Sequence, residues 1–418
     1  MDESSNQRAL SLGEKLNHAE QEAHRCLLCH DAPCSKRCPA AAEPARFIRS
    51  LRFRNLKGAV ETLRENNPLG GVCARVCPTE KLCAKGCSRS GLDRPVDIAM
   101  IQGVLTDYEH ECQIKICQPI KQDKQSVAII GAGPAGLSAA RALALAGHPV
   151  VVFEAQQQAG GWTRYGIPAS RLPAELIERE VALIAECGVE IRYGTRIGED
   201  ITLDELRSQY AAVIVASGLW QPMRSVVSES AQVLAGVDFL YQQRTATNTG
   251  STAKRVVVIG GGDVAMDCAN EAKRLGADVT VLYRRGINEM PATQAEKSHI
   301  NRLGIPIIPN AILSELIEDN GELIALKGQF IEWQDRHTHR ELEGAELSIS
   351  CDLLIDATGQ TARHPVEADE TRGLFIAGDL AHGGRTVVDA VADGKQVATR
   401  LMQFLAQCEP SQQMAMEG

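Results

Sequence analysis

The stretch SVAIIGAGPAGLSAARALALAGHPVVVFEA, residues 126–155, decides the fold of this chain. Its apolar run Val127–Ile130 predicts a buried parallel strand, and the alanine- and leucine-rich run Leu137–Ala146 predicts a helix. A GxGxxG loop joins them, and this strand–turn–helix context is typical of a unit that binds a dinucleotide. Its glycines allow a tight turn, close approach of a pyrophosphate and packing of the helix on its strand. The predicted contacts are Gly131, Gly133, Pro134, Ala135, Gly136 and Glu154, a carboxylate that suits a ribose hydroxyl.

A second unit of the same kind spans residues 254–285, KRVVVIGGGDVAMDCANEAKRLGADVTVLYRR. Its loop contributes the predicted contacts Gly260, Gly262, Asp263, Val264 and Ala265. The next strand ends in Arg284 and Arg285 instead of an acidic residue, and a guanidinium there suits a 2′-phosphate. This favours NADPH over NADH, the alternative being two solvated arginines at a strand end.

Two such units in one chain indicate a bound flavin, FAD, and a diffusible nicotinamide. The similar segments AAVIVASG (211–218) and CDLLIDATG (351–359) flank the second unit, which suggests that it is inserted in the first. We therefore predict an FAD-binding domain at 121–245 and 355–410 and an NAD(P)-binding domain at 246–354. Asp379 in the returning segment is expected to bind the ribityl or phosphate region of the flavin. The segment RTVVDAVADG is expected to begin a helix whose positive end faces the flavin ring.

No catalytic acid or nucleophile is expected, because hydride transfer is the chemistry of the cofactors themselves. The segment GGWTRYGIP, residues 160–168, lacks the cysteine pair of a disulfide reductase. That activity is therefore not expected.

Composition sets further limits on the function. The net charge of −9 argues against nucleic-acid binding, and no apolar run approaches the ~18 residues that span a bilayer. The polar, acidic N-terminus resembles neither a signal peptide nor a transit peptide, so we expect a cytoplasmic protein without membrane contact. In a reducing compartment disulfides are improbable, and clustered thiols then indicate metal or redox chemistry.

Eight of the 14 cysteines lie between Cys26 and Cys87. Their spacing is C-x2-C-x4-C-x3-C-P followed, from Cys73, by C-x3-C-P-x4-C-x3-C, in a helical domain predicted at residues 1–120. The Cys-Pro endings favour iron–sulfur clusters over structural zinc or free thiols, which remain the alternatives. The other six cysteines are expected to be unpaired. The fold class is thus α/β, with an N-terminal α-helical iron–sulfur domain followed by two Rossmann-like domains.

The chain carries, in order, the double cysteine cluster and the segments IIGAGPAGL, GGW, GIPASRLP, VIGGGDVAMDCA, EMPA and AGDL. Together these motifs cover residues from about 20 to 405. In this order the chain resembles the family of the glutamate synthase small subunit and the N-terminal half of dihydropyrimidine dehydrogenase. The segments RCLLCHDAPC and VDIAMIQ are most similar to PreT-type subunits of bacterial NAD-dependent dihydropyrimidine dehydrogenases.

This resemblance implies two [4Fe–4S] clusters and leaves Cys73 without a cluster role. The first would be held by Cys26, Cys29, Cys34 and Cys87, and the second by Cys38, Cys77, Cys83 and Gln102. Further expected flavin contacts are Gly161, Trp162, Arg171 and Thr386. PreT-type subunits are associated with NAD, whereas Arg284 and Arg285 resemble an NADP site.

The resemblance also implies a partner. Electrons would pass between NAD(P)H, FAD and the clusters to an FMN-containing catalytic subunit that reduces uracil or thymine, in a heterotetramer. One alternative is a glutamate synthase small subunit, and another is a zinc-stabilised, nucleotide-sensing protein without turnover. The tail at 411–418 is expected to be disordered.

Overall fold

The computed structural model describes residues 10–225, 230–245 and 253–408, and the chain divides into two compact units. Unit 1 combines residues 1–163, 171–218 and 364–418, and unit 2 combines residues 164–170 and 219–363. The predicted tail at 411–418 lies outside the described residues. No helix among the described residues is long and apolar enough to cross a membrane.

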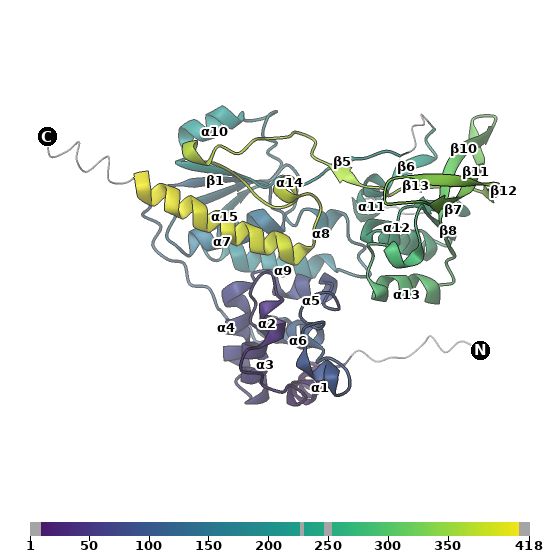
Figure 1. The fold of residues 1–418 in the computed structure, drawn as a ribbon. Coiled ribbons are helices and arrows are strands. Elements are labelled where there is room, and N and C mark those ends of the chain that lie inside the picture. The colour runs from purple at the N-terminus through teal and green to yellow at the C-terminus, as the bar shows by residue number, and fades with distance from the viewer. Residues whose placement is uncertain (1–9, 226–229, 246–252, 409–418) are drawn as a thin grey trace. The chain divides into compact units, whose positions relative to one another are not determined.

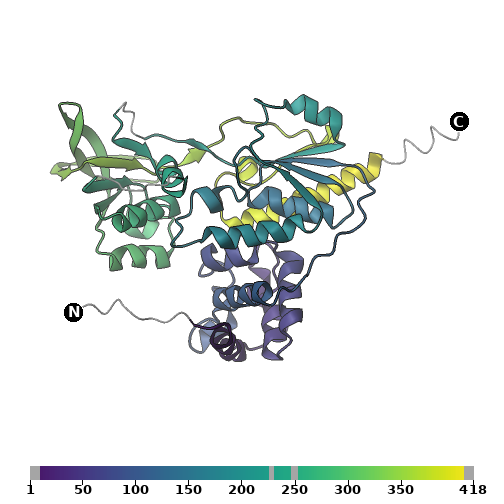
Figure 2. The same cartoon turned by 180° about the vertical axis from the view of Figure 1, so that it is seen from behind.

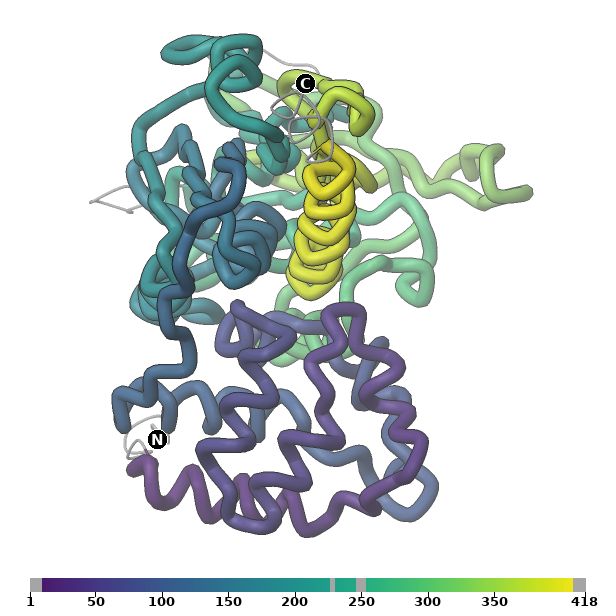
Figure 3. The backbone as a smooth tube through the Cα atoms, turned by 90° about the vertical axis from the view of Figure 1, so that its left-hand side faces the viewer, coloured from purple at the N-terminus to yellow at the C-terminus, as the bar shows by residue number. Residues whose placement is uncertain are grey.

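Unit 1 begins with a group of helices, which Figure 3 shows as a cluster of purple and dark blue turns. They are α1 (Leu12–His24), α2 (Pro33–Lys36), α3 (Pro44–Arg52), α4 (Leu56–Asn66), α5 (Gly70–Val76), the 3-10 turn η1 (Ser88–Gly91) and α6 (Ile98–Glu111). A capping box between Ser11 and Glu14 begins α1. Amphipathic α3 buries Phe47, Ile48 and Leu51 in a core shared with α1, α4 and α6.

The rest of unit 1 is built on a five-stranded parallel sheet with the order β15-β4-β1-β2-β3, of which Figure 1 labels β1. The strands are β1 (Val127–Ile130), β2 (Val150–Phe153), β3 (Val189–Arg192), β4 (Ala212–Val215) and β15 (Leu374–Ile376). The helices are α7 (Pro134–Ala144), α8 (Trp162–Tyr165, which continues into unit 2), α9 (Ala174–Ala185), α10 (Leu203–Gln209), the turn η3 (Glu370–Arg372), α14 (Asp379–His382) and α15 (Val387–Cys408). From β1 the chain adds β2 and β3 on one side of the sheet and then β4 and β15 on the other, so the carboxyl ends of β1 and β4 form a switch-point crevice.

Helices α7 and α15 pack closely beside this crevice, as Figure 2 also shows from behind. A Cβ on Gly394 of α15 would lie 2.1 Å from the carbonyl oxygen of Ala135 in α7. Only glycine allows this approach. The contact fixes the start of α15 next to the start of α7.

Unit 2 contains a second parallel sheet with the order β6-β13-β7-β8-β9. Its strands are β6 (Val233–Ala235), β7 (Arg255–Ile259), β8 (Asp278–Tyr283), β9 (Ile307–Pro309) and β13 (Leu353–Asp356). Its helices are α11 (Gly236–Thr245), α12 (Asp263–Arg274), the turn η2 (Ile287–Glu289) and α13 (Gln294–Arg302). An antiparallel sheet of β10 (Ala311–Asp319), β11 (Glu322–Trp333) and β12 (His339–Ser350) and a small pair, β5 (Gln221–Pro222) with β14 (Gln360–Thr361), complete it.

The division of the chain into two units differs from the domain boundaries that the sequence predicts at 245/246 and 354/355. Strand β13, which lies in the segment CDLLIDATG, pairs with β7 and β6 in the second sheet, so unit 1 resumes only at residue 364. Residues 219–245 also belong to unit 2, because β6 pairs with β13. Three strands of the second sheet thus lie outside the predicted glycine-loop unit at 254–285: β6 before it, and β9 and β13 after it.

The expectation of unpaired cysteines is wrong for one pair. Cys117, in the linker after α6, forms a disulfide with Cys187, which follows α9. The bond joins the linker to the body of unit 1 across 70 residues of sequence.

Candidate functional site

The first candidate site is the crevice at the carboxyl ends of β1, β4 and β15. Gly131 follows β1 with a φ of +102°, and a Cβ there would lie 2.5 Å from the carbonyl oxygen of Ala216. A Cβ on Gly133 would meet only the Cα of Gly161, at 3.9 Å. The backbones of Gly133 and Gly161 therefore line an open cradle at the start of α7, which fits a pyrophosphate. Gly136 packs α7 on β1, since a Cβ there would lie 2.0 Å from the carbonyl oxygen of Gly131.

Glu154 lies directly after β2, where its position in the sequence predicts it. Its carboxylate accepts the backbone N–H of Ala132 in the glycine loop at 2.7 Å and that of Gln156 at 2.8 Å. The residue is 6% exposed, and burial raises the pKa of its carboxyl, while the backbone hydrogen bonds oppose that rise. A carboxylate held in this way retains acceptor capacity for a ribose hydroxyl.

The returning segment brings Asp379 and Thr386 to the same edge of the sheet. Asp379 begins α14 and accepts the backbone N–H of Arg385 at 3.1 Å, and burial raises its pKa to about 6. The Thr386 hydroxyl donates to the Asp389 carboxylate at 2.5 Å and accepts the Asp389 backbone N–H at 3.2 Å. Thr386 therefore caps α15, and the N-terminal charge of that helix is available to a flavin.

The other predicted contacts of unit 1 have simpler positions. Pro134 and the buried Ala135 open α7, and the half-buried Trp162 begins α8. Arg171 is half-buried at the point where the chain returns to unit 1.

The second candidate site is the glycine loop after β7 in unit 2. Gly260 has a φ of +146°, and a Cβ there would lie 2.6 Å from the carbonyl oxygen of Ala357, which follows β13. A Cβ on Gly262 would meet nothing within 4 Å, so this side of the loop is open. Asp263, Val264 and the buried Ala265 form the first turn of α12. The loop thus fits a pyrophosphate at the helix N-terminus.

The structure separates the roles of the two arginines after β8. The guanidinium of Arg285 lies 4.9 Å from the ring centre of Trp333 and donates to the carbonyl oxygen of Arg336 at 3.0 Å. Trp333 in turn donates its indole N–H to the carbonyl oxygen of Arg284 at 2.7 Å. Arg284 is exposed, so its guanidinium is the more accessible of the two.

The eight clustered cysteines form two groups of mutually interacting thiols. Burial, with smaller contributions from Cys26 and Cys87, raises the pKa of the Cys34 thiol to about 11. Burial likewise raises the pKa of Cys26, to which Cys87 and Cys29 also contribute. The first group is therefore Cys26, Cys29, Cys34 and Cys87.

The second group surrounds Cys77. Burial and then the thiols of Cys73, Cys83 and Cys38 raise the pKa of Cys77. Burial and Cys38 also raise the pKa of Cys83 to about 12, with a smaller effect from Cys34. The second group is therefore Cys38, Cys73, Cys77 and Cys83, and it adjoins the first.

Gln102 contacts α5, the helix that leads to Cys77, and Cys73 lies within that helix. Gln102 is 7% exposed, and its amide nitrogen donates to the carbonyl oxygen of Gly70 at 2.6 Å. Cys73 is 3% exposed, and its thiol contacts the side-chain oxygen of Asn67 at 3.9 Å. The structure thus places a buried amide beside the N-terminus of α5.

Among the described residues, no group of three or more His, Cys, Asp or Glu side chains is arranged around one metal ion. A single zinc ion would need four thiolates at one centre, whereas a cubane distributes its ligands over separate irons. The clustered thiols fit the donor set of iron–sulfur clusters.

Sequence reasoning missed a buried charge network between the helices and the flavin fold of unit 1. Arg64 donates to both oxygens of Glu109, and also to Glu180 of α9 at 2.7 Å. Glu180 accepts the backbone N–H groups of Gly71 at 2.6 Å and Val72 at 3.0 Å, in the first turn of α5. The helical period of ELIEREVALIA places Glu180 on the same face as Leu176, Ile177 and Ile184, a signal that its carboxylate needs a buried partner.

Lys395 of α15 was missed as well. Its ammonium donates to the carbonyl oxygens of Ala40 at 2.8 Å and Asn66 at 2.9 Å, both in the helical region. It also lowers the pKa of Cys38, against the larger effect of burial. Nothing in the local sequence pattern distinguishes Lys395 from an ordinary surface lysine.

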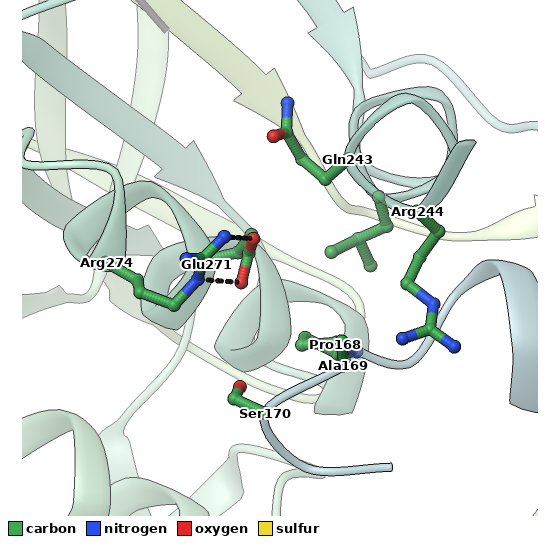
Figure 4. Close-up of a pocket in the computed structure, with 8 residues that line it drawn as sticks. Pro168, Ala169, Ser170, Gln243, Arg244, Glu271 and Arg274 are labelled. Atoms are coloured by element: carbon green, nitrogen blue, oxygen red, sulfur yellow. Dashed lines mark hydrogen bonds and ion pairs between the residues drawn. The ribbon is translucent and has the colours of Figure 1, made fainter. Parts of the chain in front are cut away.

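Unit 2 also contains a pocket of about 410 Å³ (Figure 4). It is lined by Pro168, Ala169, Ser170, Leu240, Gln243, Arg244, Glu271 and Arg274. Arg274 pairs with Glu271 in the last turn of α12, at the end opposite to the glycine loop. No predicted cofactor contact lines this pocket.

Two family models match the chain. Residues 3–114 match dihydropyrimidine dehydrogenase domain II, 4Fe-4S cluster, and residues 125–394 match pyridine nucleotide-disulphide oxidoreductase. A solved structure of FprA from Mycobacterium tuberculosis in complex with NADPH has a similar fold, with a TM-score of 0.60 and 16% identity. The similarity covers 69% of this chain and 86% of that one. The fold and the sites define an iron–sulfur flavoprotein oxidoreductase that binds NAD(P)H.

Two curated relatives are similar over most of their length. The NAD-dependent dihydropyrimidine dehydrogenase subunit PreT of Salmonella typhimurium is 42% identical, covering 93% of this chain and 94% of the relative. The glutamate synthase [NADPH] small chain of Azospirillum brasilense is 29% identical, covering 91% and 88% respectively. The chain belongs to the family of PreT subunits of NAD-dependent dihydropyrimidine dehydrogenase.

Proposed function

We propose that the chain is the electron-input subunit of a dihydropyrimidine dehydrogenase. In this proposal an FMN-containing partner reduces uracil or thymine to the 5,6-dihydro form, in a cytoplasmic heterotetramer. The observation that carries it is the buried amide of Gln102, hydrogen-bonded to Gly70 at the start of the helix that contains Cys73 and leads to Cys77, in a chain with two glycine-loop sites. Gln102 would take the fourth ligand position, and Cys73 would remain a buried thiol held by Asn67.

The ligands would divide between two clusters in line with the two groups of thiols. Cys26, Cys29, Cys34 and Cys87 would hold one [4Fe–4S] cluster, and Cys38, Cys77, Cys83 and Gln102 the other. Because the amide nitrogen of Gln102 is engaged by Gly70, its side-chain oxygen is the atom left for iron. The same residues support the domain prediction 1–120 for the cluster region, of which residues 1–9 lie outside the described residues.

Helix α15 connects the flavin crevice with the second cluster. It begins at the crevice, where Thr386 caps it, and its residues Asp389 and Lys395 influence the pKa values of Cys77 and Cys38. The second cluster would therefore be the one nearer the flavin, and the first would be the outer one. Bound FAD accepts two electrons together from a nicotinamide and can release them singly.

The residues of each site would hold their cofactor in a defined orientation. In unit 1 the glycine loop, Glu154 and Asp379 would bind the phosphates, ribose and ribityl chain of FAD. The segments Gly161–Trp162 and Arg171 would flank it. In unit 2 Gly260–Ala265 would bind the pyrophosphate of the nicotinamide cofactor, and exposed Arg284 favours NADPH.

The proposal is tested by purifying the tagged chain anaerobically from its native host and identifying the co-purified subunit by mass spectrometry. The complex is then assayed for NAD(P)H oxidation with and without uracil. A flavin mononucleotide-binding subunit and uracil-dependent oxidation are the expected results. A very large amidotransferase subunit, with oxidation that depends on glutamine and 2-oxoglutarate, would instead assign the chain to glutamate synthase.

A further inference from the structure

Three large apolar side chains are exposed close to the first group of thiols. Leu27, between Cys26 and Cys29, is 46% exposed, whereas Phe53 and Leu92 are 70% and 68% exposed. Single exposed apolar residues are ordinary, but several around one candidate redox centre are not.

Hydrogen bonds hold the three segments that carry these side chains next to one another. Arg52, which precedes Phe53, donates to the carbonyl oxygen of Cys26 at 2.9 Å. The thiol of Cys29 lies 3.4 Å from the hydroxyl of Ser88 in η1, four residues before Leu92. The segment that carries Leu27 therefore contacts both the segment that carries Phe53 and the η1 turn, which precedes Leu92. We call these three residues and their segments the Leu27 face.

Arg25 holds the η1 loop against the segment that carries Leu27. Its guanidinium donates to the Asp93 carboxylate at 2.9 Å and to the carbonyl oxygen of Arg94 at 2.7 Å. Arg89 donates in the opposite direction, to the carbonyl oxygen of Arg25 at 3.4 Å. Leu92 is thus exposed on a loop that these hydrogen bonds hold in place.

The segments that form the Leu27 face carry an excess of basic residues, although five of them form ion pairs with Glu20, Glu22, Glu61 and Glu65 of neighbouring segments. Residues 24–57 and 81–94 contain 12 lysines and arginines against three aspartates and glutamates, although the whole chain has a net charge of −9. The side chain of Arg54 is 81% exposed although it pairs with Glu20 at 3.3 Å, and Arg49 is also exposed. An apolar centre with a basic surround is the composition of an interface for an acidic partner.

We propose that the Leu27 face docks an acidic surface of the electron-accepting partner subunit, which places that subunit beside the outer cluster. This inference rests on the proposed function. A second copy of the chain fits the face less well, because a two-fold dimer would bring the same basic segments together.

The test measures the affinity of the partner subunit, taken from the native complex, for variants of the cluster-loaded chain. The charge variant is Arg49→Glu with Arg54→Glu, and the apolar variant is Phe53→Ser with Leu92→Ser. Lys327→Glu with Arg340→Glu and Ile324→Ser, all in unit 2, are the matched controls, since their side chains are also exposed. Dissociation constants are measured by biolayer interferometry at low and high salt.

The charge variant is expected to weaken binding about tenfold at low salt and much less at high salt, because screening removes the attraction. The apolar variant should weaken binding at both salt concentrations, and the controls should bind like the wild type. Equal affinity for all variants would overturn the proposal. A self-association of the chain that the charge variant abolishes, with partner binding intact, would assign the face to a second copy and also overturn it.

The docking proposal and the proposed function can fail independently of each other. Variant-sensitive binding in a complex that shows no uracil-dependent oxidation would refute the dihydropyrimidine assignment and leave the docking face standing. Iron content and circular dichroism of each variant show whether a change in affinity reflects lost clusters or lost fold.

Discussion

Replacing Glu180 with alanine should destabilise unit 1 by about 3–5 kcal/mol, the usual effect of breaking a buried ion pair. Glu180 is 1% exposed and Arg64 is 4% exposed, so water cannot replace the lost carboxylate. Arg64 would retain Glu109, but the N–H groups of Gly71 and Val72 would lose their acceptor. Each buried donor left unsatisfied costs about 1–3 kcal/mol.

The assay is equilibrium urea unfolding followed by circular dichroism, with the release of flavin as a second probe. Glu175→Ala, an exposed position on the same helix, is the control and should change the free energy of unfolding by less than about 0.5 kcal/mol. Glu180→Gln should fall between the two, because an amide oxygen can still accept one of the backbone hydrogen bonds. A loss below about 1 kcal/mol for Glu180→Ala would refute the reasoning that this network joins the helices to the flavin fold.

Three further predictions concern other parts of the chain. Arg284→Ala should weaken NADPH binding about 10- to 100-fold in calorimetry, the loss of a charge-assisted hydrogen bond, and leave NADH binding unchanged, with a smaller effect for Arg285→Ala. In flavin-free protein Asp379 has its pKa raised to about 6, above the ~3.9 of an unfolded chain. Its contribution to stability is therefore present below pH ~4 and lost as the pH rises through 6, by about 2–3 kcal/mol, and Asp379→Asn should abolish this dependence in urea unfolding. Digestion of the alkylated, unreduced protein should yield a Cys117–Cys187 linked peptide in mass spectrometry, and Cys187→Ser should lower the free energy of unfolding by about 2–4 kcal/mol.

The parallel sheets were predictable because their signals are local. The run Val127–Ile130 and the loop from Gly131 to Gly136 lie within one strand–turn–helix unit, and the structure forms it there. The unit boundary was not predictable in the same way, because β13 carries no local sign of which sheet it joins. The long antiparallel strands at 311–350 were not foreseen either.

In the candidate sites, too, only features with a local signal in the sequence were predictable. The position of Glu154 follows from chain order, since it ends the strand after the loop. The difference between Arg284 and Arg285 does not, because Trp333 lies 48 residues beyond Arg285 and only the fold brings it to the guanidinium. Lys395 likewise meets Ala40 across most of the chain.

The central claim, that one chain carries a flavin and two iron–sulfur clusters, is tested most directly by cofactor analysis of the anaerobically purified protein. Iron, acid-labile sulfide, zinc and FAD are measured per chain. The account predicts about eight irons and about eight sulfides for each FAD, with negligible zinc. About four irons for each FAD, or zinc in place of iron, would contradict it.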